Sequence, residues 1–346
     1  MVVGNLKVKS KKAKVQGKIK NFYFLIAVFT FSFYLFTFLC GCGPTYGKKD
    51  VKNSVIKICK AEYGADVKVE TTGKTMFIYL PLSNLLDPSF SLTKNASEKI
   101  NNVIFAAARV ALSTDAQFDF YCVIAHDTRM PELQIIIIKN VDDIKRLFAS
   151  DISRGEYMKR MLIDLRWSPQ AKKEQVIKEI FNKMNLDPKW QDQVMSDFFK
   201  SEPTALSDIG YWDNRFYIKD ITLSEFLAEQ IASRIRIEFR EDKDLKNTFL
   251  LKSAKGLYTT VKGKRLFRFE ILAERSVMLA GTTIEDSDKI LGGALSVAAQ
   301  VLHGYHFTDY DAVEVFDQRE GRSVEVTPQE LEAYRLKKVK FSEIGK

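Results

Sequence analysis

Cysteine and histidine are scarce in this chain of 346 residues, which contains four Cys and three His. Two of the cysteines, Cys40 and Cys42, lie near the N-terminus, so the remainder of the chain has only Cys59 and Cys122. Neither has a neighbouring histidine of the kind that activates a catalytic thiolate. We expect two buried free thiols, which pack as small apolar side chains. A Cys59–Cys122 disulfide is the alternative, if the compartment is oxidising.

Acidic residues are absent from positions 1–41, and residues of either charge are absent from positions 22–39. Seven lysines lie within the first 20 residues, and a basic segment before an apolar run is typical of an export signal. Without residues 1–41 the chain keeps 46 of its 53 basic residues and all 44 acidic ones, a net charge of +2. A near-neutral body lacks the positive surface that binds a phosphate backbone, which excludes nucleic acid as a partner.

The tetrad Leu39-Cys40-Gly41-Cys42 ends the apolar run. It resembles the lipobox of bacterial lipoproteins, in which an aliphatic, a variable and a small residue precede an invariant cysteine. The resemblance implies that residues 1–41 are a cleaved signal peptide, that Cys42 is lipidated, and that residues 42–50 form a tether. It also implies a bacterial cell envelope location, on the periplasmic face in a Gram-negative cell.

An uncleaved signal anchor is the alternative interpretation of the leader. The 18 uncharged residues at 22–39 would form a helix of about 27 Å, close to the bilayer core of about 30 Å. The lysine-rich residues 1–20 would then stay in the cytoplasm. Both interpretations place residues 43–346 outside the cytoplasm, with the membrane as a partner.

An internal repeat is the main architectural feature of the remaining chain. Residues Gly73–Tyr79 reappear as Gly263–Phe269 at an offset of 190, and the same offset aligns Asp127 with Asp317. In each copy a Gly-Lys turn introduces a strand, a long helix follows, and two further strands flank a turn. The expected strands are 66–71, 76–82, 118–125 and 133–139 in the first copy, and 266–272, 310–316 and 323–326 in the second.

The sequence therefore predicts an α+β fold of two homologous modules, each ordered helix, two strands, long helix, two strands, helix. The modules are residues 51–150 and 222–341, with a tail at 342–346. Thr93, Thr283 and Thr327 are the expected helix caps. The order resembles the profilin-like or roadblock layout, an antiparallel sheet with helices packed on it. We expect the two modules to contact one another with pseudo-two-fold symmetry.

Residues 151–221 do not belong to the repeat and are expected to form a helical connector. Pro169 and Pro188 each follow a capping residue, which predicts helices near 169–185 and 188–200. The aromatic residues between 209 and 221 indicate an extended segment. It either packs on one of the modules or forms an exposed binding strip.

The best candidate metal ligands are His303, His306 and Asp309, because two histidines three residues apart on a helix can share one face. A helix C-terminus that favours histidine explains the same pattern, and we expect no metal or other cofactor. His126-Asp127 has the composition of a base and its orienting acid, but no serine or cysteine nucleophile accompanies it. We expect Asp127, like Asp317, to form a turn.

Two further segments have the composition of possible binding sites. Gly292-Gly293 lies inside a predicted helix without a phosphate-binding loop, so we expect it to permit close packing on the sheet. The basic turn Lys262–Arg265 is expected to be a solvated hairpin tip, with contact to anionic lipid or peptidoglycan as the alternative.

The sequence thus favours a membrane-anchored extracytoplasmic lipoprotein that binds an unknown envelope protein or takes part in envelope assembly, and it favours no enzyme activity. The alternatives are an envelope enzyme with a site between the modules and a bitopic protein held by the uncleaved anchor.

Overall fold

The computed structural model of the protein describes residues 45–89, 91–168, 174–185, 187, 191, 204–276 and 284–344. The tetrad Leu39–Cys42 and the apolar run at 22–39 lie outside these ranges, as do Thr283 and all but one residue of the helix expected at 188–200. Within these ranges, none of the helices is both long enough and apolar enough to span a bilayer.

The first module has the predicted order of elements. After a 3₁₀ turn at Lys48–Asp50, its elements are α2 (Val51–Tyr63), β1 (Lys68–Thr72), β2 (Thr75–Leu82), α3 (Lys94–Leu112), β3 (Phe120–Asp127), β4 (Leu133–Asn140) and α4 (Val141–Phe148). The Thr93 hydroxyl accepts a hydrogen bond from the N–H of Ala96 at 3.3 Å and caps α3, as expected.

The second module repeats this order with one additional short helix. Its elements are α8 (Leu223–Glu241), α9 (Lys243–Thr248), β8 (Phe249–Val261), β9 (Lys264–Arg275), α10 (Ile284–Gly304), β10 (Ala312–Asp317), β11 (Arg322–Val326) and α11 (Pro328–Arg335), before a 3₁₀ turn at Phe341–Glu343. Thr327 forms a complete capping box with Glu330, and Pro328 occupies the first turn of α11. The structure therefore has the duplicated α+β architecture that the sequence predicted.

Each sheet is antiparallel except at its centre. The strand order is β1-β2-β3-β4-β5 in the first module and β11-β10-β9-β8 in the second. The central pairs, β2 with β3 and β9 with β10, are parallel because a long helix connects the two strands of each pair. The sheet of each module is thus antiparallel as expected, apart from its central pair of strands.

The repeat has a shift of one residue that the ungapped alignment missed. Leu82 pairs with Asp127 across the first central pair, and Ile271 pairs with Asp317 across the second, so the strands correspond at an offset of 189. Ile78 accordingly packs with the α3 side chains and Phe267 with those of α10. Side chains alternate between the two faces of a sheet, so an offset of 190 would have assigned every side chain of β9 to the wrong face.

The connector is only partly helical. It contains α5 (Arg154–Lys159), β5 (Leu162–Trp167), α6 (Glu174–Met184), β6 (Gly210–Trp212) and β7 (Arg215–Tyr217). Strand β5 pairs with β4 and extends the first sheet, so the first module does not end at residue 150. Helix α6 falls within the predicted range 169–185.

The aromatic stretch of the connector packs on the first module. This was one of the two arrangements expected for it, the other being an exposed binding strip. Tyr211 stacks on Tyr79 of β2 with ring centroids 3.9 Å apart, and Phe216 meets Tyr211 edge-on. The apolar side chains of the first sheet that point away from α3 lie in the same hydrophobic cluster as this stretch and module 2. The connector thus covers a sheet face that would otherwise be exposed and apolar.

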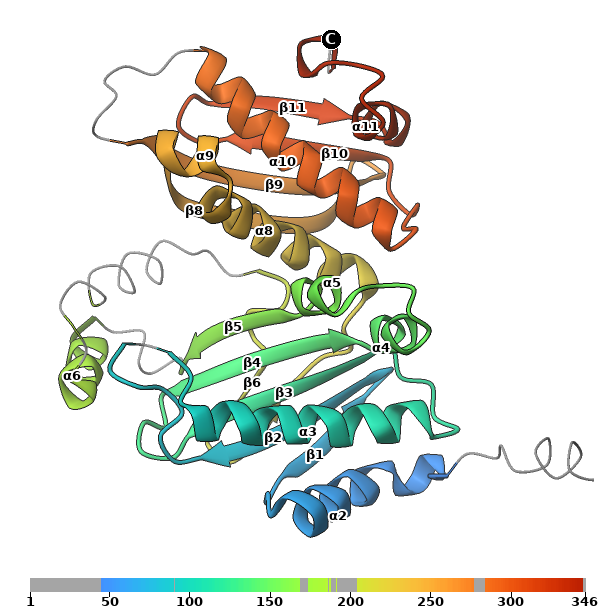
Figure 1. The fold of residues 1–346 in the computed structure, drawn as a ribbon, viewed down its shortest axis with the longest axis vertical. Helices are drawn as coiled ribbons and strands as arrows, with labels where there is room; N and C mark the ends of the chain where they lie inside the picture. The colour runs from blue at the N-terminus through green and yellow to red at the C-terminus, as the bar shows by residue number, and fades with distance from the viewer. Residues whose placement is uncertain are drawn as a thin grey trace, which may run out of the picture.

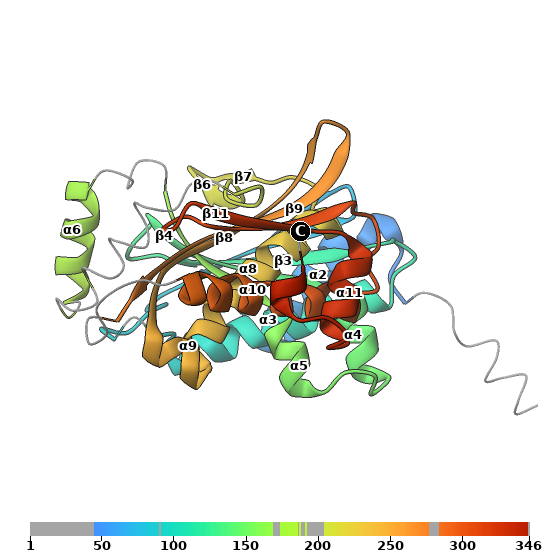
Figure 2. The ribbon, with the colours of Figure 1, turned by 90° about the horizontal axis from the view of Figure 1, so that it is seen from above.

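The two modules lie side by side in the same orientation. In Figure 1, α3 and α10 both cross in front of their sheets, and β4 and β11 point the same way. Figure 2 shows these helices on one side of the sheets and the hairpin β6-β7 on the other. The modules are therefore arranged in tandem with a similar orientation, and the expected pseudo-two-fold arrangement is wrong, although the modules do contact one another.

Candidate functional site

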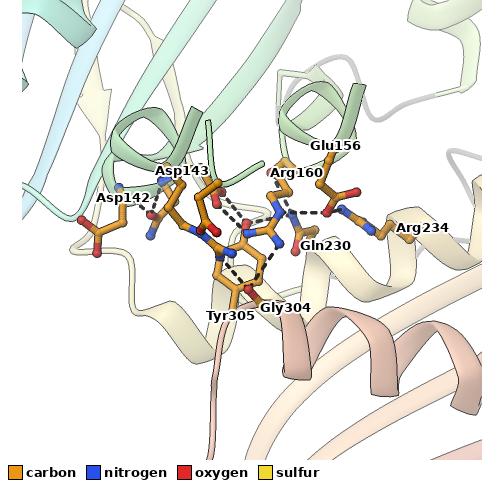
Figure 3. A network of polar contacts seen from close by, with 11 residues as sticks. Asp142, Asp143, Glu156, Arg160, Gln230, Arg234, Gly304 and Tyr305 are labelled. Atoms are coloured by element: carbon orange, nitrogen blue, oxygen red, sulfur yellow. Dashed lines mark hydrogen bonds and ion pairs between the residues drawn. The ribbon is translucent and has the colours of Figure 1, made fainter. Parts of the chain in front are cut away.

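A buried polar network joins the two modules (Figure 3). Asp143 comes from α4, Arg160 from the end of α5, and Gln230 and Arg234 from α8, while Tyr305 follows the last residue of α10. Asp143 and Arg160 are only 3% and 5% exposed. Charged side chains are rarely buried to this extent unless they are paired, so the network is the most unusual polar feature of the described residues.

The ion pair between Arg160 and Asp143 is at the centre of this network, with the guanidinium nitrogen 2.8 Å from the carboxylate. The Tyr305 hydroxyl donates to the same carboxylate, and the guanidinium lies 4.5 Å from the centre of the Tyr305 ring. The Gln230 amide donates to the carbonyl of Arg160 at 2.8 Å and to the Tyr305 hydroxyl at 3.1 Å. One guanidinium therefore connects both modules.

A second ion pair and a backbone contact extend the network. Glu156 accepts hydrogen bonds from Arg160 at 2.8 Å and from Arg234 at 2.7 Å. The carbonyl of Gly304, at the C-terminus of α10, accepts from Arg146 at 2.6 Å and from Arg160 at 3.3 Å. Two cations thus complement the negative end of the α10 dipole.

Burial and pairing shift the pKa values within the network in opposite directions. Burial raises the pKa of the Asp143 carboxyl, in opposition to the hydrogen bonds from Tyr305 and Arg160. Burial also opposes the ionised form of Glu156, but the hydrogen bonds from Arg160 and Arg234 outweigh it and lower the pKa. Asp143 is thus the carboxylate of the network for which burial outweighs pairing, and Glu156 the one for which pairing outweighs burial.

Lys139 of β4 is the most perturbed amine among the described residues. It is 5% exposed, and its ammonium lies 3.9 Å from the centre of the Tyr157 ring. Burial lowers its pKa to about 8, and the nearby Asp143 offsets part of this effect. An amine with such a pKa can act as a base, but Lys139 lines neither the groove at the start of the first module nor the cavity between α10 and α11.

The larger cavity is a groove of about 520 Å³ at the start of the first module. Four lysines contribute to its walls, and one acidic residue, Asp115, lies among them. The lysines are Lys48, Lys49, Lys52 and Lys74. The lining also includes Val51 and Phe118, so the groove combines positive charge with apolar surface.

A smaller cavity of about 300 Å³ lies between α10 and α11 and includes His303, His306 and Glu332. The two imidazole rings are 6.0 Å apart, and Glu332 lies 3.9 Å from His303. Asp309 does not join them, because its carboxylate pairs with Arg265. Across the described ranges, no three His, Cys, Asp or Glu side chains are grouped as a metal site would require.

The side chains of His126 and Asp127 form hydrogen bonds with different partners and not with one another. The His126 ring bonds to the Tyr79 hydroxyl at 2.6 Å, and burial lowers its pKa. Asp127 instead accepts from the N–H groups of Leu85 at 2.8 Å and Arg129 at 2.9 Å. The carboxylate thus does not orient the imidazole as a catalytic acid would.

Asp317 shares the turn-forming role of Asp127, as the repeat predicted. It is fully buried and accepts the N–H of Arg319, two residues further on, at 3.0 Å. Asp127 makes the equivalent bond to Arg129, and both correspond to the Asx-turn pattern.

Cys59 and Cys122 are free and buried, and no disulfide joins them. Cys59 packs among residues of α2 and α3, whereas Cys122 faces the opposite side of the first sheet, so the proposed bridge is excluded by geometry. Burial raises the pKa of both thiols, that of Cys59 to about 11, which leaves them unreactive.

The remaining two candidates have structural roles. Lys264 pairs with Glu325 at 3.4 Å and Arg265 with Asp309 and Asp311, so acidic neighbours balance the hairpin tip. A side chain at Gly292 would meet the Tyr334 hydroxyl at 3.1 Å. Gly292 therefore makes room for the C-terminal segment. A side chain at Gly293 would meet Leu245 of α9 at 3.6 Å, so neither glycine serves close packing on the sheet as expected.

Comparisons with protein family models, with curated proteins and with solved structures find no match to this chain. The interface network was missed from the sequence because α4 and α5, which supply one part of it, are distant along the chain from α8 and the end of α10, which supply the rest. A local signal did exist for the groove, since Lys48 and Lys49 follow the tetrad within seven residues.

Proposed function

We propose that this protein is a membrane-anchored lipoprotein of the bacterial envelope, whose body lies outside the cytoplasm and binds a protein partner or takes part in envelope assembly. The observation that carries the proposal is the tetrad Leu39-Cys40-Gly41-Cys42 at the end of a basic and then apolar leader.

The position of the folded body supports this proposal. The N–H of Tyr46 donates to the carbonyl of Ser113 at 3.1 Å, so the chain is fixed to the first module four residues after Cys42. Such a leader, followed at once by a folded body, suits a protein that is held close to a membrane surface.

Packing between the modules favours binding over catalysis. Arg160 and Asp143 fill the interface at which an enzyme site between the modules would have to lie, and their charged groups are engaged with one another. We therefore rank the envelope enzyme below the binding protein.

The lipid anchor is tested by replacing Cys42 with alanine and measuring incorporation of labelled fatty acid. We expect Cys42→Ala to abolish labelling and to accumulate the unprocessed precursor. Cys40→Ala is the matched control, because it removes the neighbouring thiol and should leave labelling intact. Labelling that persists in Cys42→Ala would contradict the lipid anchor and favour the bitopic alternative.

A further inference from the structure

The lysine groove at the start of the first module lies at the end of the body where the chain leaves towards the membrane. Lys48 and Lys49 are exposed, and neither ammonium has an ion-pair partner within the described part of the chain. Lys52 pairs with Glu70, and the Lys74 ammonium lies 3.2 Å from the Asp119 carboxylate. Lys48 and Lys49 therefore outnumber Asp115, the one acidic residue of the lining, and leave the groove with a net positive charge.

The tether restricts how far this groove can be from the lipid. Three residues lie between Cys42 and Tyr46, which is fixed to Ser113, and the four steps from one Cα atom to the next reach about 14 Å at most. Charges act over a screening length of about 8 Å at physiological ionic strength. Lys48 and Lys49 come two and three residues after Tyr46, so a tether this short allows their ammonium groups to approach the membrane surface to within this range.

We propose that this groove binds the phosphate headgroups of anionic phospholipids in the membrane that holds Cys42, and so orients the body on that membrane. The inference rests on the proposed anchor. Since residues 43–346 are close to neutral overall, the attraction comes from this one end of the body and not from a general positive charge. The apolar wall formed by Val51 and Phe118 suits the glycerol region next to the phosphates.

The test measures the reactivity of individual lysines in the intact anchored protein. The protein is reconstituted in vesicles of phosphatidylcholine alone or mixed with phosphatidylglycerol, and its lysines are labelled with a membrane-impermeant amine reagent. We expect Lys48 and Lys49 to react roughly fivefold more slowly on the anionic vesicles, and high salt to remove the difference. Lys243 and Lys246 on α9, at the opposite end in Figure 1, should react equally on both.

A pair of variants tests the groove itself. Lys52 and Lys74 line the same groove, so we expect the anionic vesicles to slow their labelling as well. This protection should be lost in Lys48→Gln/Lys49→Gln and retained in Lys243→Gln/Lys246→Gln. Both pairs are exposed, so neither change should disturb folding.

Flotation of the vesicles separates the two possible failures. Protein that does not float contradicts the anchor itself and removes the basis of the inference. Protein that floats but shows the same lysine reactivity on both kinds of vesicle contradicts the headgroup contact and leaves the anchor standing.

Discussion

At the scale of single residues, the contact between the modules depends on the ion pair of Arg160 and Asp143. Both side chains have lost nearly all contact with water, so each relies on its partner and on the hydrogen bonds from Tyr305 and Gln230. Removal of one member of a buried pair leaves an uncompensated charge. The free-energy cost of that charge is larger than the net stabilisation that the intact pair provides.

We expect Arg160→Met to lower the free energy of unfolding by about 3–5 kcal/mol, because Asp143 is left buried without its cation. Urea denaturation of the purified protein measures the change. Arg109→Met is the control: its pair with Glu62 is exposed, and exposed pairs contribute at most about 1 kcal/mol. Equal losses in the two variants would contradict the importance assigned to the buried pair.

Lys139 makes stability depend on pH in a direction that its lowered pKa defines. The folded-state pKa is about 8 against an ordinary 10.5, so between these values the unfolded chain binds more protons than the folded one. Stability contributed by this residue therefore rises with pH across that window. At pH 7 the amine is charged in both states, and its burial is unfavourable.

We expect Lys139→Met to be more stable than the natural protein at pH 7, by about 1–3 kcal/mol, and to lack the rise above pH 8. Denaturation at a series of pH values measures both effects. Lys145→Met, at an exposed position on α4, should follow the natural protein throughout. A Lys139→Met profile parallel to that of the natural protein would show that the amine is not perturbed by burial.

At the scale of elements, helix α8 differs from its counterpart α2 because it is covered on two sides. Phe226, Leu227 and Ala228 are three consecutive buried residues, whereas the exposed side of α2 is polar. A helix that is apolar on more than one face belongs between layers, and α8 packs both against β8 and towards the first module.

Gly256 of β8 permits the close approach of α8. A side chain there would place its first carbon 2.1 Å from the carbonyl oxygen of Ala228, which belongs to the helix backbone. We expect Gly256→Ala to displace α8 and to destabilise the protein by about 1–3 kcal/mol, as overpacking does. Thermal denaturation measures the loss. Gly155→Ala, whose nearest atom would be 3.8 Å away, should be neutral or slightly stabilising.

The element order was predictable because turn residues, helix caps and strand-forming runs are local signals that occur twice in the chain. The residue-by-residue correspondence of β2 and β9 was not predictable. Matching Gly73 to Gly263 hides the fact that the two hairpin turns have different geometry. Gly73 begins the two-residue turn after Thr72, whereas Gly263 ends the turn after Val261. The two glycines are identical residues at different turn positions.

At the scale of the whole molecule, the modules are arranged in tandem because their contacting surfaces are not equivalent. The first module contributes α4, α5 and β5, and the second contributes α8 and the end of α10. A two-fold arrangement would require one surface to pair with itself. The sequence could not reveal this, since Asp143, Arg160 and Tyr305 approach one another only after both modules have folded.

The proposed anchor places one end of this tandem body at the membrane and leaves the second module further away from it. The lipobox-like tetrad could be recognised from the sequence because the motif is short and the basic and apolar segments that precede it are contiguous with it. The partner is not encoded in so local a pattern, because a binding surface combines residues from several elements.

The most direct test of the account is the intact mass of the mature protein isolated from membranes. We expect a chain that begins at Cys42, shorter by 41 residues than the full sequence and heavier by a diacylglyceryl group and, where present, an N-terminal acyl chain. The mass of an unmodified chain of 346 residues would contradict the lipoprotein and identify an uncleaved signal anchor instead.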